Sequence, residues 1–380
     1  MQKILALCAC DSGHEAMCVE LANALTTFSF EKKSWEEMIS RAEENGLSSL
    51  LYKHTKQMGC NIPNTSRRLL QSLYFRNRSS NISRNKAVVE IVKAYEQEGI
   101  DVMLIKGIAL SNFVYEEIGS RPMRDIDLLV KKSDLKKAEK VLLDLAYTTT
   151  ECSVIPDDYY HLIPLEKKIG GLPVSIELHH NLLPFSPQYP LWPLEKLYGT
   201  SLEIKIGATT ARTLSLEDTL HYVYLHGFQA PLTYEPFRLI HVADIVSLVE
   251  KYFCDLDWSY IRKETPTLLN SISRFHFLTP WSKQVRTELR FDVKTQPWGV
   301  GASFSGWPLR KVKMVRSLHL PLLLKETFVP SRWWLEVYYG YLRGISYWKV
   351  RFFYHPRTIW RWGKVYCNAC LKGRKKRIKD

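Results

Sequence analysis

The chain has 380 residues, of which 46% are hydrophobic and 24% are charged. This balance is typical of a chain that folds around a core and excludes an intrinsically disordered protein. No apolar run approaches the roughly 18 residues that a transmembrane helix requires, so we expect no membrane span.

The net charge of +14 is concentrated at one end. Eighteen of the 53 Lys and Arg residues lie in residues 310–380, where only three acidic residues oppose them. That segment therefore carries +15 and residues 1–309 carry −1. The basic character belongs to a tail, and the rest of the chain has no excess charge with which to bind a nucleic-acid duplex.

The N-terminus and the cysteines indicate the compartment. The start, MQKILALCACDSG, has a short apolar run and no clear cleavage pattern, so we expect no secretory signal. The eight cysteines lack the regular spacing of a disulfide framework. These features predict a cytoplasmic protein, and the basic tail raises the option of a peripheral position at the membrane.

Residues 1–99 are predicted to form an N-terminal helical region. Ser34, with Glu37 three residues later and Gly46 at the end of the run, has the pattern of a capping box and a glycine stop. A further helix is predicted from Ser79 to Gly99, with apolar residues on one face.

Residues 100–210 are predicted to form a small mixed sheet with helices. Apolar runs at 100–105, 126–130, 161–166 and 172–179 have strand character, and helical patterns follow the first two. A second helical region is predicted at 211–298. Residues 299–380 are predicted to begin with a linker at 299–308 and to continue as a basic, aromatic tail.

Three acidic residues form the centre of the predicted site. In a strand the side chains alternate, so Asp125 and Asp127 project to one face while Ile126 enters the core. Carboxylates held roughly 6 to 7 Å apart in this way can share divalent cations. Glu177 points outward by the same alternation in its own strand, and if the two strands are neighbours all three acids converge on one surface. That is the arrangement that two-metal phosphoryl chemistry requires.

Basic residues flank the acid pair. Lys106-Gly107 lies at a strand-to-helix junction, where glycine lets the backbone approach a phosphate and the helix presents free N–H groups. Arg121 and Arg124 precede Asp125 and have the planar guanidinium groups that clamp phosphate oxygens. A lone D-x-D on a strand is usually only a solvated face, whereas the whole assembly is far more specific.

The segment LIKGIALSNFVYEEIGSRPMRDIDLLV resembles the signature of the uncharacterised nucleotidyltransferase family, within the DNA polymerase β-like superfamily. The resemblance continues in SIELHHNL, LSLEDTLHYVYLHGF and FRLIHVADIVSLV, and spans roughly residues 30–262. One departure is that many superfamily members carry a Gly-Ser pair where this chain has Lys106-Gly107.

This resemblance implies an α+β fold with a polymerase β-like core, flanked by N-terminal and C-terminal helical regions. It implies an enzyme of bacterial origin that uses Mg²⁺, with two ions expected, and an NTP donor. Asp125 and Asp127 would be metal ligands, Glu177 would be the third carboxylate, and Lys106 and Gly107 would meet the triphosphate. The activity expected is transfer of an NMP to a hydroxyl group on a small molecule, a peptide or a protein, with release of pyrophosphate.

Two other functions stay open. The same fold can transfer a γ-phosphoryl group to a peptide in the manner of a kinase. A catalytically inactive module that binds anionic membrane or nucleic acid through its basic tail is the third reading.

Further candidates are the polar residues outside this core. His179 shares a face with Glu177 and would orient an acceptor, or would be an ordinary hydrogen-bonded strand residue. His226, Arg238 and Asp244 would line the acceptor cleft, although ion pairing between helices is the favoured reading. Cys367 and Cys370 form a solitary C-x-x-C, which lacks the second ligand pair of a structural zinc site.

The tail from residue 330 onward interleaves aromatic residues with Lys and Arg. This composition suits a lipid surface, single-stranded nucleic acid or an acidic peptide. We expect the aromatic residues to dock in part on the core, with the basic end contacting an anionic partner.

Overall fold

The computed structural model describes residues 1–150, 159–184, 192–229, 238–290, 320–330, 332–339, 346–361 and 363–364. The chain divides into two compact units: Phe30–Tyr222, and Met1–Ser29 together with Val223–Asp380. The predicted linker at 299–308 and the pair Cys367 and Cys370 lie outside the described residues. Among the described residues, no helix is long and apolar enough to cross a membrane.

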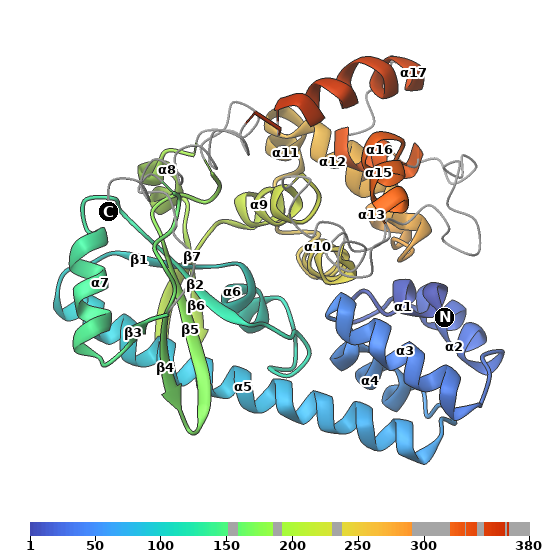
Figure 1. Cartoon of the computed structure of the whole chain (residues 1–380), viewed down its shortest axis with the longest axis horizontal. Helices are drawn as coiled ribbons and strands as arrows, with labels where there is room; N and C mark the ends of the chain where they lie inside the picture. The colour runs from blue at the N-terminus through green and yellow to red at the C-terminus, as the bar shows by residue number, and fades with distance from the viewer. Residues whose placement is uncertain are drawn as a thin grey trace. The chain divides into compact units, whose positions relative to one another are not determined.

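The first unit contains helices and one mixed sheet (Figure 1). Its helices are α3 (Lys32–Asn45), α4 (Ser48–Gln57), α5 (Asn64–Gln97), α6 (Lys106–Phe113), α7 (Leu135–Asp144) and α8 (Leu194–Gly199), and α9 (Leu216–Phe228) begins in it. Its strands are β1 (Val102–Ile105), β2 (Asp125–Val130), β3 (Thr148–Thr149), β4 (Leu165–Ile169), β5 (Leu172–His179), β6 (Leu202–Ile206) and β7 (Thr209–Thr213).

The strands form a seven-stranded sheet in the order β3-β4-β5-β2-β1-β7-β6. β2 pairs in parallel with β5, and β1 pairs in parallel with β7, while the other neighbours are antiparallel. The α+β class and the mixed sheet predicted from the sequence are confirmed. The hairpin of β6 and β7 was not predicted as strands, although Ile204, Ile206 and Ala211 show the alternating burial of a half-buried pair.

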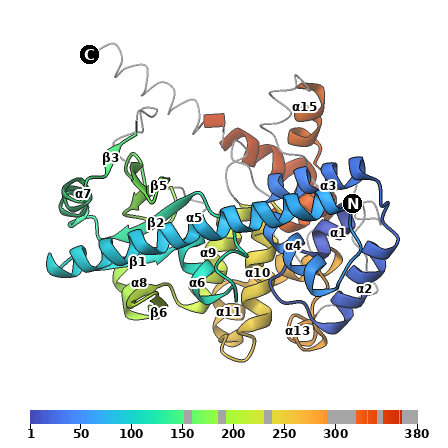
Figure 2. The same ribbon diagram turned by 90° about the horizontal axis from the view of Figure 1, so that it is seen from below.

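One face of the sheet makes the core of this unit. The C-terminal half of α5 runs along the sheet in both views (Figure 1, Figure 2), and α7 packs beside it. Alternate residues of β2 and β5 enter this core. Its buried members include Ala87, Val88, Ile91, Tyr95, Leu104, Ile126, Leu128, Val130, Ala138, Leu142, Ile176 and Leu178. Because strand side chains alternate, the remaining residues of β2 and β5 project from the opposite face, where the acids lie.

Two predicted helix starts are wrong. α3 begins at Lys32, ahead of Ser34, where the backbone carbonyl of Glu31 accepts the amide of the buried Trp35, and no side chain caps it. Gly46 ends α3 with a left-handed φ of 74°, as predicted. α5 begins at Asn64 and not at Ser79, since its polar N-terminal half still carries a buried apolar stripe that packs on α3 and α4.

The second unit is helical. It contains α1 (Gln2–Leu7), α2 (Glu15–Thr26), α10 (Leu239–Lys251), α11 (Trp258–Glu264), α12 (Pro266–Ile272), a 3₁₀ turn at Ser273–Phe277, α13 (Lys283–Glu288), α15 (Leu320–Phe328), α16 (Arg332–Tyr339) and α17 (Tyr347–Lys349). A π-helical turn, Val350–Tyr354, extends α17 into a further helical stretch over 355–361. Val350 and His355 are both buried, which follows from the five-residue repeat of the π turn.

Candidate active site

The acid pair is positioned by the pairing of β2 with β5. Asp127 lies opposite Glu177 in the parallel register, and Asp125 lies opposite Ser175. Single ligand atoms of Asp127, Glu177 and His179 lie within 4.8 Å of one another. The two segments that carry these residues are far apart in the sequence, and the register of the sheet brings them together.

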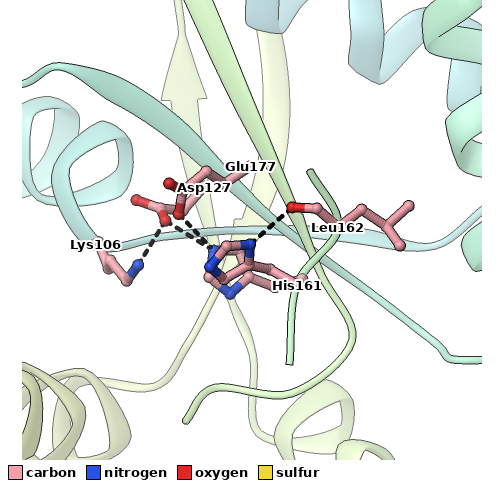
Figure 3. Close-up of polar contacts among 6 residues, drawn as sticks. Lys106, Asp127, His161, Leu162 and Glu177 are labelled. Atoms are coloured by element: carbon pink, nitrogen blue, oxygen red, sulfur yellow. Dashed lines mark hydrogen bonds and ion pairs between the residues drawn. The ribbon is translucent and has the colours of Figure 1, made fainter. Parts of the chain in front are cut away.

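Lys106 supplies the positive charge of this cluster (Figure 3). Its Nζ lies 2.6 Å from Oδ1 of Asp127, and both side chains are largely buried. Burial opposes the charge on each group, but their mutual attraction outweighs it. The pKa of Asp127 is therefore lowered by Lys106 and His179, and the pKa of Lys106 is raised well above its usual value by Asp127.

His179 is the second partner of Asp127. Its Nε2 lies 2.9 Å from Oδ1 of Asp127 and 3.4 Å from Oε2 of Glu177, and its side chain is fully buried. Nε2 donates to the Asp127 carboxylate, which fixes the orientation of that carboxylate. His179 was predicted to share the face of Glu177, and the structure places it there.

Asp125 lies within electrostatic reach of the same cluster. Burial raises its pKa to about 6, and the charges of Asp127 and Glu177 contribute in the same direction. Lys106 opposes this shift without cancelling it.

The backbone changes direction where β1 ends and α6 begins. Lys106 has a left-handed φ of 52°, which is uncommon for a residue with a Cβ. A Cβ added at Gly107 would lie 2.6 Å from Nη1 of Arg121 and 3.2 Å from the Cβ of Met123. An alanine here would therefore have to displace the Arg121 guanidinium and press against Met123, while Lys106 carries the backbone strain.

The two predicted phosphate-binding arginines differ in environment. Arg121 is buried, and its guanidinium lies over Gly107. Arg124 has an exposed side chain next to the acid pair. The structure thus brings Arg121 to the strand-to-helix junction and leaves Arg124 at the surface.

Two residues near the site were missed by the sequence reasoning. Arg84 of α5 is buried and donates from Nη2 to the carbonyl of Arg124 at 2.9 Å, and burial lowers its pKa while Asp125 opposes that change. His161 packs against His179 with ring centroids 5.0 Å apart and ring planes tilted by 50°, and its Nδ1 donates to the carbonyl of Leu162 at 2.7 Å. Neither belongs to a recognisable motif, so no signal in one sequence would have found them.

The remaining candidates lie away from this cluster in the chain. Asp244 is buried in α10, Arg238 precedes that helix, and the ring of His226 lies 5.6 Å from the ring of His241. All three belong to the second unit. Their role toward an acceptor stays a prediction.

The chain belongs to the uncharacterised nucleotidyltransferase family, whose sequence profile matches residues 31–269. The resemblance seen in the sequence over roughly residues 30–262 is confirmed, and with it the transferase class of the enzyme. No curated protein matches the chain.

Solved structures of nucleotidyltransferases give distant likenesses. The crystal structure of ANT(2'')-Ia in complex with adenylyl-2''-tobramycin is 15% identical and covers 45% of this chain and 90% of its own, with a TM-score of 0.31. A solution structure of the antibiotic-resistance factor ANT(2'')-Ia is also 15% identical, covers 45% and 85%, and has a TM-score of 0.30. An antigenic nucleotidyltransferase-like protein from Paracoccidioides brasiliensis is 17% identical, covers 53% and 96%, and has a TM-score of 0.32.

Proposed function

We propose that this protein is a Mg²⁺-dependent enzyme that transfers an NMP from an NTP to a hydroxyl acceptor and releases pyrophosphate. The observation that carries the proposal is the pairing of Asp127 with Glu177 on adjacent parallel strands, with the Lys106 ammonium on Asp127. Membership of the nucleotidyltransferase family supports the same chemistry.

The acidic side chains of the site offer oxygen ligands, which fit a hard divalent cation. Carboxylate oxygens are the ligands that Mg²⁺ prefers, and Asp125, Asp127 and Glu177 would supply them. An imidazole nitrogen suits softer metals, so we assign His179 the task of orienting Asp127. When bound, Mg²⁺ would neutralise the acids and the charge that develops on the phosphates, and two ions fit the family's chemistry.

The donor phosphates would meet the basic residues at the start of α6. Lys106 would donate to the triphosphate from its position beside Asp127, and Gly107 would let the backbone approach. Arg121 lies against Gly107 and would hold the departing pyrophosphate, while the exposed Arg124 would contact the donor from the surface.

The acceptor hydroxyl would lose its proton to Glu177. The hydroxyl oxygen forms a bond to the α-phosphorus of the donor, and the bond from that phosphorus to the β-phosphate oxygen breaks. Glu177 is more exposed than Asp127, so it is the acid of this pair that an acceptor reaches more easily. We propose a small molecule, a peptide or a protein as the acceptor.

We also propose a cytoplasmic location. In the part of the chain that the structure describes, Cys8, Cys10, Cys18, Cys60 and Cys254 are free thiols, which suits a reducing compartment.

The test of this proposal follows which phosphate of the NTP reaches the acceptor. The full chain is incubated with Mg²⁺ and each NTP, labelled at either the α- or the γ-phosphate, together with small-molecule, peptide and protein acceptor fractions. We expect the α-label to reach an acceptor and the γ-label to leave as pyrophosphate, with both lost in Glu177→Gln. Transfer of the γ-label would establish the kinase-like alternative, and an absence of both transfers would favour an inactive binding module.

A further inference from the structure

The helix that begins at α17 has two unlike sides. Its buried side is fixed by His355, whose Nε2 donates to the carbonyl of Thr327 at 2.7 Å and whose Nδ1 accepts from the hydroxyl of Tyr339 at 3.0 Å. Val350 is buried on the same side. These contacts hold the helix against α15 and α16, so its orientation within this unit is set by internal packing.

The opposite side presents large aromatic residues to solvent. Trp348, Phe352, Phe353 and Trp360 are each between 59% and 62% exposed, and we call these four residues the aromatic face. Phe328 and Val329 follow Thr327, the residue that binds His355, and they are 56% and 50% exposed. Scattered exposed apolar residues are ordinary, but four rings on one short helix mark an interaction surface.

The charge of this helix selects an anionic partner. Lys349, Arg357, Arg361 and Lys364 are exposed along it. The sequence contains no acidic residue between Glu336 and Asp380. The helix itself therefore presents positive charge to a partner and contributes no acidic side chain.

The arrangement of the rings distinguishes lipid from nucleic acid. Base stacking needs an open ring face. Trp348 and Phe352 stack on each other with centroids 5.7 Å apart and planes 9° apart, and the Lys364 ammonium covers Trp360 at 3.7 Å. One face of each of these three rings is therefore already covered, and the exposed aliphatic Val329 adds surface that does not stack on bases. Trp and Phe flanked by Lys and Arg are the composition of a helix that lies in a bilayer interface.

We propose that the aromatic face binds the surface of an anionic lipid bilayer. The four rings enter the boundary between headgroups and acyl chains, and the basic residues pair with lipid phosphates. This surface belongs to the second unit and does not depend on the nucleotidyltransferase chemistry of the first.

The test uses the full chain and vesicles of phosphatidylcholine with or without phosphatidylglycerol, in a co-sedimentation assay. We expect binding only to vesicles that contain phosphatidylglycerol. The variant Trp348→Ser/Phe352→Ser/Trp360→Ser should lose it, while Phe30→Ser/Phe75→Ser, which changes similarly exposed rings of the first unit, should bind normally. Arg357→Gln/Arg361→Gln should weaken binding roughly thirtyfold, since each basic group near such a surface contributes about 1 kcal/mol.

A second measurement covers the case in which the triple variant fails to fold. Brominated phosphatidylglycerol should quench the tryptophan fluorescence of the wild type, and the conservative variant Trp348→Phe/Trp360→Phe should lose most of that quenching. Binding that is abolished by salt but unchanged in both aromatic variants would overturn insertion of the rings. Binding to a single-stranded oligonucleotide, but not to vesicles, that depends on the aromatic face would overturn the lipid assignment.

Discussion

Replacing Lys106 by Met tests the electrostatics of the site most stringently. The change leaves the nearly buried Asp127 carboxylate with His179 as its remaining polar partner. Removing one member of a buried ion pair costs about 3–5 kcal/mol, and we expect the lower end because His179 remains. Asp127→Asn should cost a similar amount because it removes the carboxylate that pairs directly with the Lys106 ammonium.

The double variant Lys106→Met/Asp127→Asn separates pairing from packing. Because it removes both charges, its cost should be about 2–3 kcal/mol smaller than the sum of the two single changes. The assay is urea unfolding at pH 7 in EDTA. Single-variant effects that add within about 0.5 kcal/mol would refute the buried pair.

The same pair predicts a pH window. The lowered pKa of Asp127 stabilises the fold above about pH 3.9, the ordinary value, and this contribution is lost as pH falls through the native pKa. The raised pKa of Lys106 stabilises the fold below about pH 10.4 and is lost as pH rises through the native pKa. The difference in unfolding free energy between wild type and the double variant should therefore be flat from about pH 5 to 9.

Three further changes test other parts of the site. Gly107→Ala places a Cβ against the Arg121 guanidinium and should cost about 1–3 kcal/mol of unfolding free energy, measured by thermal unfolding. In the control Gly199→Ala the added Cβ meets nothing within 4 Å, so that change should be nearly neutral. Equal effects of the two changes would contradict the packing argument. Asp125→Asn in EDTA should stabilise the fold by roughly 1–3 kcal/mol at pH 8 and by almost nothing near pH 4. The native pKa of about 6 lies above that of the unfolded chain, so the charged Asp125 carboxylate destabilises the fold at high pH, and this cost is lost as pH falls. A pH-independent effect would show that this carboxyl is not perturbed. Arg84→Met loses the hydrogen bond that holds the segment before Asp125, so it should destabilise the fold by about 1–3 kcal/mol and lower kcat more than Arg84→Lys does. Unchanged kinetics in both variants would show that Arg84 contributes to packing and not to catalysis.

The local pattern of the sequence predicts the acids, but not their partners. Strand alternation places Asp125 and Asp127 on one face of their strand, and Glu177 with His179 on one face of theirs, because that depends only on the two-residue period. The parallel register that sets Asp127 opposite Glu177 is a tertiary property of the sheet. Its basis is the packing of the opposite face on α5 and α7, which no local pattern contains.

Arg84 shows the same limit more sharply. It lies 40 residues before Arg124, on the helix predicted from Ser79 to Gly99, and reaches the site only because α5 lies along the sheet. Lys106 was predicted to meet phosphate, but its strained backbone and its ion pair with Asp127 depend on how β1 joins α6. The predicted starts of α3 and α5 were wrong for a similar reason, because the buried side chains along these helices outweigh the local capping signals.

The most direct test of the central claim is a thermal-shift measurement with the four NTPs, each with and without Mg²⁺, on the wild type and on Glu177→Gln. A ligand at about a hundred times its dissociation constant stabilises the native state by roughly 2.7 kcal/mol, which is readily seen. We predict a shift with at least one NTP that requires Mg²⁺ and is strongly reduced in Glu177→Gln. No Mg²⁺-dependent shift with any NTP, or an equal shift in the variant, would contradict the assignment of Asp125, Asp127 and Glu177 as the nucleotide-bound metal site.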